Sequence, residues 1–176
     1  MPPPIQTDRL TLRPFAPDDV PAFVASIFHD DAVWNELSGG VVYDAEHEAE
    51  QLITGWQGDL HPPLAVVRSA DAALMGYAAL KPIAGAPDDT ELTIALGSRY
   101  WHNGYATEAG RAMLRYGFHE RRLERIYGLL HPYNARAKRL ATRLDMTFKA
   151  VNRDFNYGKE LAIYVLGRAT YVSLYP

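Results

Sequence analysis

The residues best suited to chemistry fall in one stretch, from Glu91 to Gly117, which joins a carboxylate, a polar loop and an amphipathic segment. Residues 91–96 alternate polar with apolar side chains and include β-branched ones, which predicts a strand. From Tyr105 onward, apolar or small residues recur at the spacing of one helix face, which predicts a helix. The loop between them therefore leads into a helix N-terminus.

A helix N-terminus that follows a glycine-containing loop is suited to binding an anion. Its first amides have no partner within the helix, and the helix dipole is positive there. Gly104 has no Cβ, so a phosphate can approach the backbone closely or the chain can adopt a positive φ. Asn103 and Thr107 are the candidate N-cap residues. Taken alone, such a glycine more often simply makes the turn between strand and helix.

The order of residues in this loop resembles a known family. Trp101-His102-Asn103-Gly104-Tyr105-Ala106 is similar to motif A of the GNAT acyl-CoA N-acetyltransferases, whose loop reads Gln/Arg-x-x-Gly-x-Gly/Ala. The run from Tyr100 to Ala109 looks like the RimJ/RimL-like branch, which includes the ribosomal-protein N-terminal acetyltransferases. Residues 7–15 resemble that branch's first strand, and Pro132-Tyr133-Asn134 resembles its approach to a later helix. Together these segments span most of the chain.

The resemblance implies both a fold and a co-substrate. The expected fold is α/β (α+β), a mixed, mostly antiparallel twisted sheet of about six to seven strands flanked by about four helices, with splayed central strands. The expected co-substrate is acetyl-CoA, without a metal. Its pyrophosphate would meet the loop amides, and its pantetheine arm would run beside residues 94–96. The residues assigned to the cofactor are Ile94, Leu96, His102, Asn103, Gly104, Tyr105, Ala106, Thr107, Asn134 and Arg139.

Acyl transfer to an amine also requires a group that removes a proton. An α-amine has a reference pKa of about 8 and a lysine amine about 10.4, so the acceptor arrives largely charged. Glu91, expected to begin its strand, matches the position where the family often carries a carboxylate that acts through water. The alternative hypothesis is that Glu91 is a strand-end carboxylate paired with nearby cations.

The segment around Asn134 matches the family only in part. Asn134 matches an asparagine that contacts pantetheine or substrate, and a plain helix N-cap explains it equally well. Ala137 and Ala141 replace the serine and tyrosine that relatives carry, so no general acid is assigned by position. Tyr133 is a candidate for that role. Arg139, with Arg136 and Lys138, can meet the 3′-phosphate of coenzyme A, although a solvated helix face is the commoner explanation.

The acceptor side is the least defined part of the sequence. In the resembling family the segment around the first two expected helices lines this site, which would place Trp34, Glu36 and Tyr43 near the substrate. The expected function is transfer of an acetyl group to a primary amine, on a protein N-terminus, a polyamine or a small molecule. The alternative is a coenzyme A-binding sensor or interaction module without catalysis, and a purely structural role is a third hypothesis.

Composition excludes several other classes. The chain has 176 residues and a net charge of −3, without a long basic run, so no nucleic-acid partner is expected. It contains no cysteine and no apolar run long enough to span a membrane. His47 lacks a second histidine four residues later, which argues against a zinc helix. We expect a single cytoplasmic N-acetyltransferase domain over residues 1–176. The resemblance allows a homodimer, which the sequence itself does not support directly.

The remaining pattern predicts the elements that position these residues. Strands are expected at 10–15, 64–68, 73–80, 91–96, 125–130, 146–151 and 161–166. Helices are expected from Pro17 to about residue 28, from Asp44 to about Trp56, from Tyr105, and after Asn134. Residues 31–43 and 81–89 are expected to be connections.

Overall fold

The computed structural model describes residues 3–37, 43–57, 59, 61–152 and 160–176. Within these ranges there are eight strands and six α-helices. The strands are β1 (Ile5–Gln6), β2 (Leu10–Pro14), β3 (Leu64–Arg68), β4 (Leu74–Ile83), β5 (Ala86–Leu96), β6 (Arg125–Leu130), β7 (Thr147–Asn152) and β8 (Leu161–Gly167). The helices are α1 (Val20–Phe23), α2 (Asp31–Leu37), α3 (Ala45–Trp56), α4 (Tyr105–Arg115), α5 (Ala135–Arg143) and α6 (Arg168–Leu174). The strands are hydrogen-bonded to one another in the order β1-β2-β3-β4-β5-β6-β8-β7.

The chain forms two compact units, one from residues 1–79 and 94–109 and the other from residues 80–93 and 110–176. In the first unit β2 pairs antiparallel with β1 and with β3, and β3 pairs antiparallel with β4. The β3–β4 register shifts between Val66 and Val67. Gly76, opposite Val66, has a φ of 148°, and a Cβ there would lie 2.0 Å from the Ala95 carbonyl oxygen. Only glycine lets the backbones of β4 and β5 come this close.

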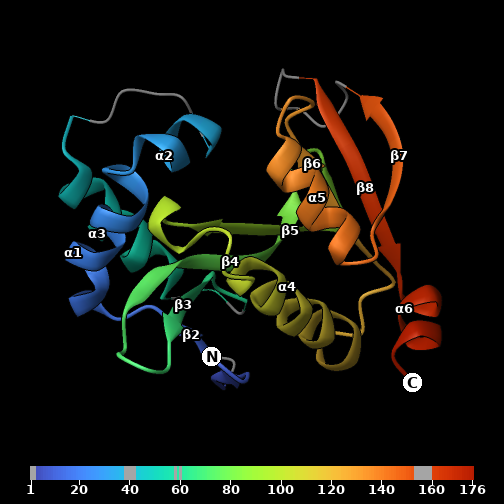
Figure 1. Ribbon diagram of the computed structural model, residues 1–176, viewed down its shortest axis with the longest axis horizontal. Helices are drawn as coiled ribbons and strands as arrows, with labels where there is room; N and C mark the ends of the chain where they lie inside the picture. Colours follow the sequence, from blue (N-terminus) through green and yellow to red (C-terminus); the bar gives the residue numbers. More distant parts are fainter. Residues whose placement is uncertain (1–2, 38–42, 58, 60, 153–159) are drawn as a thin grey trace. The chain divides into compact units, whose positions relative to one another are not determined.

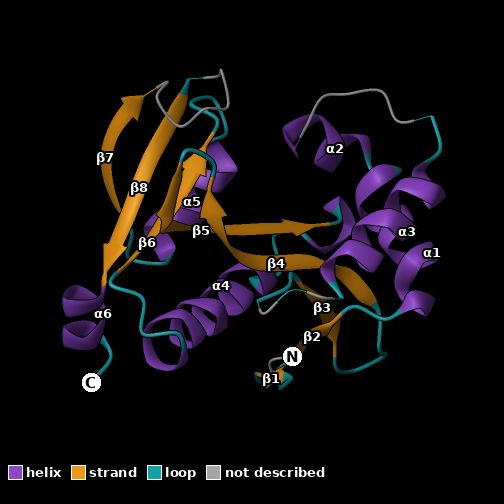
Figure 2. Cartoon of the chain, turned by 180° about the vertical axis from the view of Figure 1, so that it is seen from behind, coloured by secondary structure: helices purple, strands orange, loops and turns teal. Residues whose placement is uncertain are grey.

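Aromatic residues fill the core of the first unit. A short 3₁₀ turn, α1 and a π-helical turn run in sequence from Pro17 to Phe28, and Figures 1 and 2 show α1 beside α3. Phe23 is almost fully buried and its ring contacts several other aromatic rings at centroid distances of 5.1–6.1 Å, those of Phe15, Phe28, Trp56 and Tyr77. Such mutual edge contacts favour one rigid arrangement of the helices.

The second unit is built on the strands β6, β8 and β7. The register of β6 against β8 is antiparallel over six residue pairs, from Arg125 with Gly167 to Leu130 with Ala162, and β7 pairs antiparallel with the other edge of β8. Helix α5 packs on β6, and α6 follows directly from β8. Phe118 is buried with its ring centroid 4.7 Å from that of Tyr171 on α6, so the C-terminal helix contributes to this core.

The predicted fold class is confirmed, with more elements than expected. The prediction of a connection at 81–89 was wrong, because β4 continues to Ile83 and β5 begins at Ala86. The prediction of a connection at 31–43 was wrong in part, because α2 occupies Asp31–Leu37. The elements β1 and α6 were not predicted. Among the described residues, the longest helices fall short of the length and apolar character needed to cross a membrane.

Candidate functional site

Two hydrogen bonds fix the loop that follows β5. The indole Nε1 of Trp101 donates to the Leu96 carbonyl at 2.7 Å, which ties the loop to the end of the strand. The Ser98 amide donates to an Asp30 carboxylate oxygen at 2.6 Å, which ties it to the residue before α2. Tyr100 is buried beneath the turn. The loop therefore enters α4 with a defined backbone path.

Two residues of the loop, His102 and Gly104, take left-handed conformations that few side chains tolerate. His102 has a φ of 64° and Gly104 a φ of 80°. Both residues are exposed, as is Asn103 between them. The first helical hydrogen bond runs from the Glu108 amide to the Gly104 carbonyl at 3.0 Å, so the amides of the three preceding residues point outward without helical partners.

The predicted N-cap was wrong for both candidate residues. Helix α4 begins at Tyr105, so the N-cap position falls on Gly104. Asn103 instead uses its side-chain amide to donate to the Trp101 carbonyl at 2.8 Å, and Thr107 lies inside the first turn. With no side chain at the N-cap, the start of the helix is left open to a ligand.

Residues from the beginning of the chain hold this loop. The Glu108 carboxylate accepts a hydrogen bond from the Thr7 hydroxyl at 2.6 Å, one from the Arg9 amide at 2.8 Å, and one from Arg9 Nε at 2.7 Å. Arg9 also donates from Nη1 to the Asn103 carbonyl at 3.0 Å, and its guanidinium lies over the Tyr105 ring, 4.5 Å from the centroid. Neither Arg9 nor Glu108 was predicted as a site residue.

These contacts set the charge of Glu108. Burial alone would raise the pKa of its carboxyl group, but the hydrogen bonds from Thr7 and Arg9, together with the positive charge of Arg9, outweigh it and lower the pKa. The carboxylate is therefore ionised in the first turn of α4, where it is paired with Arg9. Pairing matters here because an uncompensated negative charge at this place would repel an anion.

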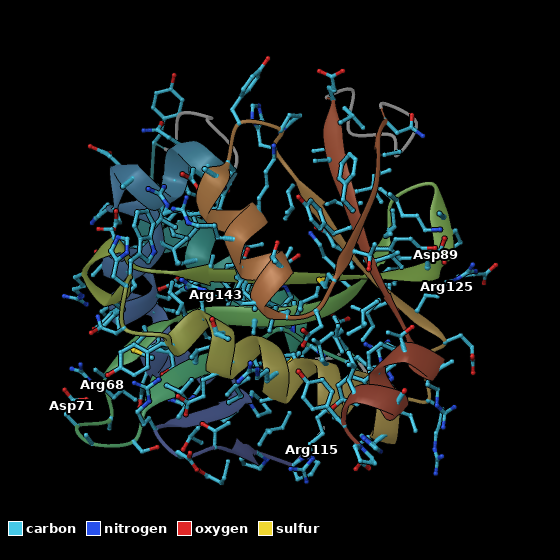
Figure 3. All side chains as sticks on the ribbon, turned by 45° about the vertical axis from the view of Figure 1, so that its right-hand side comes forward. Arg68, Asp71, Asp89, Arg115, Arg125 and Arg143 are labelled. Carbon is cyan, nitrogen blue, oxygen red and sulfur yellow. The ribbon has the colours of Figure 1, made fainter. Side chains whose placement is uncertain are left out.

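Two further arginines surround the same turn. Arg68 at the end of β3 lies 5.5 Å from the Tyr100 ring centroid, and Arg99 lies 4.8 Å from it. Figure 3 shows Arg68 beside Asp71, with which it forms an ion pair at 2.6 Å. The surroundings of the loop are therefore rich in cations, two of which are already paired with carboxylates.

Glu91 lies in the middle of β5 rather than at its start, because the strand begins five residues earlier than expected. It is buried and stands opposite Tyr127 in the parallel register between β5 and β6. That register covers two residue pairs, Thr90 with Ile126 and Glu91 with Tyr127. Lys81 Nζ lies 3.7 Å from Glu91 Oε2, so a cation is present beside the carboxylate.

Other groups on these strands are also paired. Asp89 lies 3.8 Å from Arg125, and Figure 3 shows the two side chains together at the end of the hairpin. Burial raises the pKa of the Tyr127 hydroxyl, and the neighbouring Asp89 charge adds to this effect. Tyr127 therefore stays protonated beside Glu91 in the strand register.

The residues predicted near α5 occupy its N-terminus and its exposed side. Asn134 is the N-cap, and its Oδ1 accepts a hydrogen bond from the Ala137 amide at 2.8 Å. Tyr133 is 86% exposed, with its ring centroid 5.5 Å from that of His131. Arg139 is exposed on the helix. The capping role of Asn134 is confirmed, and a cofactor contact for these three residues stays a prediction.

The residues predicted on the acceptor side lie on α2 and just before α3, in the first unit. Trp34 stacks on Phe28 with a centroid distance of 4.8 Å and packs against the aromatic core. Glu36 is exposed two residues later on α2, a spacing that places two side chains on different helix faces. Tyr43 is 97% exposed before α3. Trp34 therefore contributes to packing, and the acceptor-binding role of all three stays a prediction.

The residues predicted for the cofactor and for catalysis thus fall into two local groups. Ile94, Leu96 and residues 102–107 lie at the end of β5, in the loop and in the first turn of α4, within the first unit. Glu91 and residues 133–139 lie in the second unit. Among the described residues, no three histidine, aspartate or glutamate side chains form a group suited to a metal ion. One feature of the sequence could have pointed to Arg9. It lies in the segment of residues 7–15 that resembles the family's first strand.

Comparisons with known proteins bear on what this arrangement does. Residues 9–147 match the model of the acetyltransferase (GNAT) domain. The N-acetyltransferase YnaD of Bacillus subtilis, itself uncharacterised, is 29% identical over 142 residues, which cover 81% of each chain. YkkB of the same organism is 38% identical over 74 residues, and the match spans 42% of either protein.

Solved structures share the fold. A GNAT-family acetyltransferase from Bacillus anthracis superposes with a TM-score of 0.81 at 22% identity, over 95% of this chain and 99% of that one. A Vibrio cholerae protein proposed to be a ribosomal-protein-serine acetyltransferase superposes with a TM-score of 0.79 at 24% identity, over 93% and 97%. At this identity the likeness concerns the fold alone. Because the domain model covers most of the chain and includes the loop at Gly104, the chain belongs to the GNAT family of acyl-CoA-dependent N-acetyltransferases.

Proposed function

We propose that the protein transfers an acetyl group from acetyl-CoA to a primary amine by direct attack within a ternary complex. The observation that carries this proposal is the loop at Gly104, where exposed backbone in left-handed conformations leads into a helix whose N-cap has no side chain. A helix start of this kind binds a diphosphate through its amides and its dipole. Membership in the GNAT family supports coenzyme A as the source of this diphosphate.

The loop residues fit this group. Gly104 has a φ of 80°, which residues with a side chain rarely adopt, and without a Cβ its backbone can be approached closely by a phosphate. In the proposal, amides between His102 and Thr107 bind the two phosphates. Ile94 and Leu96 provide backbone partners for the pantetheine arm, and Arg139 is the candidate for the 3′-phosphate.

Glu91 is the proposed acceptor of the amine proton, through a water molecule. Its burial supports a role beyond surface charge, because a carboxylate is rarely buried without a partner or a task. The ion pair with Lys81 supports the competing structural role. A positioned base of this kind contributes about 10²-fold to the rate.

The transfer itself makes one bond and breaks one. The amine nitrogen bonds to the acyl carbon, the carbon–sulfur bond breaks, and coenzyme A leaves as a thiolate. A backbone amide of the donor-binding strand is the proposed partner of the developing oxyanion, worth about 10²–10³ in rate. The thiolate accepts a proton from solvent, from Tyr133 or from a group held near Asn134.

The acceptor is proposed as an amine-bearing small molecule or a protein N-terminus. The likeness to the Vibrio cholerae protein favours a protein N-terminus as the acceptor. Trp34, Glu36 and Tyr43 remain the proposed acceptor-side residues. We further propose that the chain acts as one N-acetyltransferase domain in the cytoplasm, as a monomer or a homodimer, without nucleic acid or membrane as partner.

The direct test is to incubate the protein with acetyl-CoA and a panel of amines and to follow free thiol with Ellman's reagent. Because the chain contains no cysteine, every thiol detected comes from coenzyme A. Thiol release that depends on one class of amine supports the proposal. Binding of coenzyme A in calorimetry without release for any acceptor would instead favour a sensor or interaction module, and absence of binding would reject both.

A further inference from the structure

One peptide group in the loop is fixed from outside. The Asn103 carbonyl accepts a hydrogen bond from Arg9 Nη1 at 3.0 Å, and Arg9 is anchored by Glu108 through Nε at 2.7 Å and Nη2 at 2.7 Å. The described chain contains no cis peptide bond, so the Gly104 N–H points opposite to the Asn103 carbonyl. By holding that carbonyl, Arg9 determines the direction of the Gly104 N–H.

Fixing this direction matters because the glycine allows the Asn103–Gly104 peptide plane to rotate by half a turn. Rotating the Asn103–Gly104 peptide by half a turn would change the Gly104 φ from 80° to about −100°, and glycine adopts both values readily. In the rotated form a carbonyl oxygen would replace the N–H. That oxygen would repel a phosphate where the amide would donate to it. The backbone preference of glycine does not favour one orientation of this peptide over the other. A contact with another residue must therefore fix the orientation.

Arg9 has the geometry to make that contact and to keep it. Its guanidinium binds the carboxylate through two nitrogens, covers the Tyr105 ring at 4.5 Å, and retains Nη1 for the carbonyl. A planar fork with five donors can do all three at once, whereas the point charge of lysine cannot. Its backbone amide also donates to Glu108 at 2.8 Å, which fixes the start of the side chain.

We propose that Arg9 is a positioning residue for the cofactor diphosphate, which turns the Asn103–Gly104 peptide so that the Gly104 N–H faces the phosphates. Glu108 anchors it, and the ion pair removes the carboxylate's repulsion of the same anion. This inference rests on the proposed function, since it assigns a role within the coenzyme A site. It requires no contact between Arg9 and the cofactor.

The test compares coenzyme A affinity among variants that separate charge from orientation. Arg9→Lys keeps the charge but cannot hold Glu108 and the Asn103 carbonyl together. The double variant with Arg9→Ala and Glu108→Gln removes both contacts while leaving the net charge unchanged. Each should weaken coenzyme A binding by about tenfold, the value of one hydrogen bond to a charged group. Arg13→Ala is the matched control, because Arg13 binds Asp19 in a similar two-nitrogen pair away from the loop and should leave the affinity unchanged.

A second measurement excludes a merely structural effect. The kcat/KM for acetyl-CoA should fall about tenfold in both Arg9 variants, whereas that for S-acetylpantetheine, which has no diphosphate, should stay at the wild-type value. In ¹⁵N-labelled protein, coenzyme A should shift the Gly104 amide resonance in the wild type and in Arg13→Ala. The shift should be lost in the charge-neutral double variant.

The outcomes separate this inference from the proposed function. Wild-type protein that fails to bind coenzyme A overturns both. Wild-type binding together with undiminished affinity in both Arg9 variants overturns the inference alone. Equal losses for acetyl-CoA and S-acetylpantetheine would also overturn it, because they would show general damage to the fold. The single variant Arg9→Ala completes the set. If it binds coenzyme A more weakly than the wild type while the charge-neutral double variant binds equally well, charge alone is responsible and the positioning role is rejected.

Discussion

Gly76 lies so close to Ala95 that a methyl group added at Gly76 would lie 2.0 Å from the Ala95 carbonyl oxygen. The contact joins β4 to the end of β5, immediately before the loop that leads into α4. The amide of Gly97 also donates to the Met75 carbonyl at 2.8 Å, so the two strands remain joined as far as the loop. The position of the candidate site thus depends on a glycine outside it.

Replacing Gly76 by alanine should therefore destabilise the protein by about 3 kcal/mol or more, because either the strands must part or the backbone must distort. The φ of 148° adds strain for any side chain. Urea denaturation measures the change. Gly55→Ala is the matched control: nothing lies within 4 Å of its added methyl group, and alanine inside α3 should gain about 0.5–1 kcal/mol. Equal stabilities for the two variants would contradict the close approach.

Glu91→Gln tests the proposed base against the structural ion pair. As a base, Glu91 should contribute about 10² to kcat/KM, and the variant should lose the acidic limb of the pH–rate profile. Lys81→Gln removes the partner at 3.7 Å and leaves the carboxylate, so it serves as the control. The proposal predicts that the lysine variant keeps most of its activity. Similar activity losses in both variants would assign Glu91 to the ion pair.

Asp19 should give the fold a measurable sensitivity to acid. Burial alone would raise the pKa of its carboxyl group, but hydrogen bonds from Arg13 and the Ala16 amide lower it below the ordinary value of 3.8. A lowered pKa means that the folded protein binds the proton less readily than the unfolded chain. The stability due to this group is complete above the ordinary pKa and is lost as the pH falls through the lower, folded value.

The variant Asp19→Asn should accordingly lose about 1–3 kcal/mol at pH 7, the value of hydrogen bonds that involve a charged group. The difference from the wild type should shrink as the pH falls below about 4, because the wild-type carboxylate is then protonated as well. Urea denaturation at pH 7, 5 and 3 gives the comparison. A difference that stays constant across this range would show that the ion pair with Arg13 does not stabilise the fold.

Substitutions at Asn134 should separate its capping role from a cofactor contact. Asn134→Ala removes the acceptor for the Ala137 amide and should cost about 1 kcal/mol of stability. Asn134→Ser and Asn134→Asp both preserve capping and should restore most of it. If the residue also contacts coenzyme A, the aspartate variant should bind it more weakly than the serine variant, because it adds a negative charge. If Asn134→Ser and Asn134→Asp bind coenzyme A with identical affinity, the role of Asn134 is limited to capping the helix.

The sequence predicted the elements that carry strong periodicity. β3, α3, β6 and β8 follow clear alternation or helical spacing, and each appears close to its expected bounds. The extent of the β4–β5 hairpin was hidden by Pro82 and Pro87, which are typical of turns, although both prolines lie within strands. Helix α2 was hidden by its short length and by the two glycines that follow it in the sequence.

The candidate site was predictable where its residues are adjacent in the chain. The loop, its glycine and the following helix could be identified together because one short segment contains all three. The contribution of Arg9 could not be identified in this way, because its contacts with Asn103 and Glu108 join residues 94 and 99 positions apart. The packing of Trp34 was equally hidden, because its partner Phe28 belongs to a different helical turn. Pairings of this kind depend on the tertiary structure.

His102 has a consequence for engineering the protein. Its φ of 64° costs a residue with a side chain about 1–2 kcal/mol, a burden that glycine would not carry. The imidazole is exposed, so removing it should leave little void behind. A glycine at this position is therefore a route to a more heat-resistant protein in which the loop before α4 keeps its present backbone path.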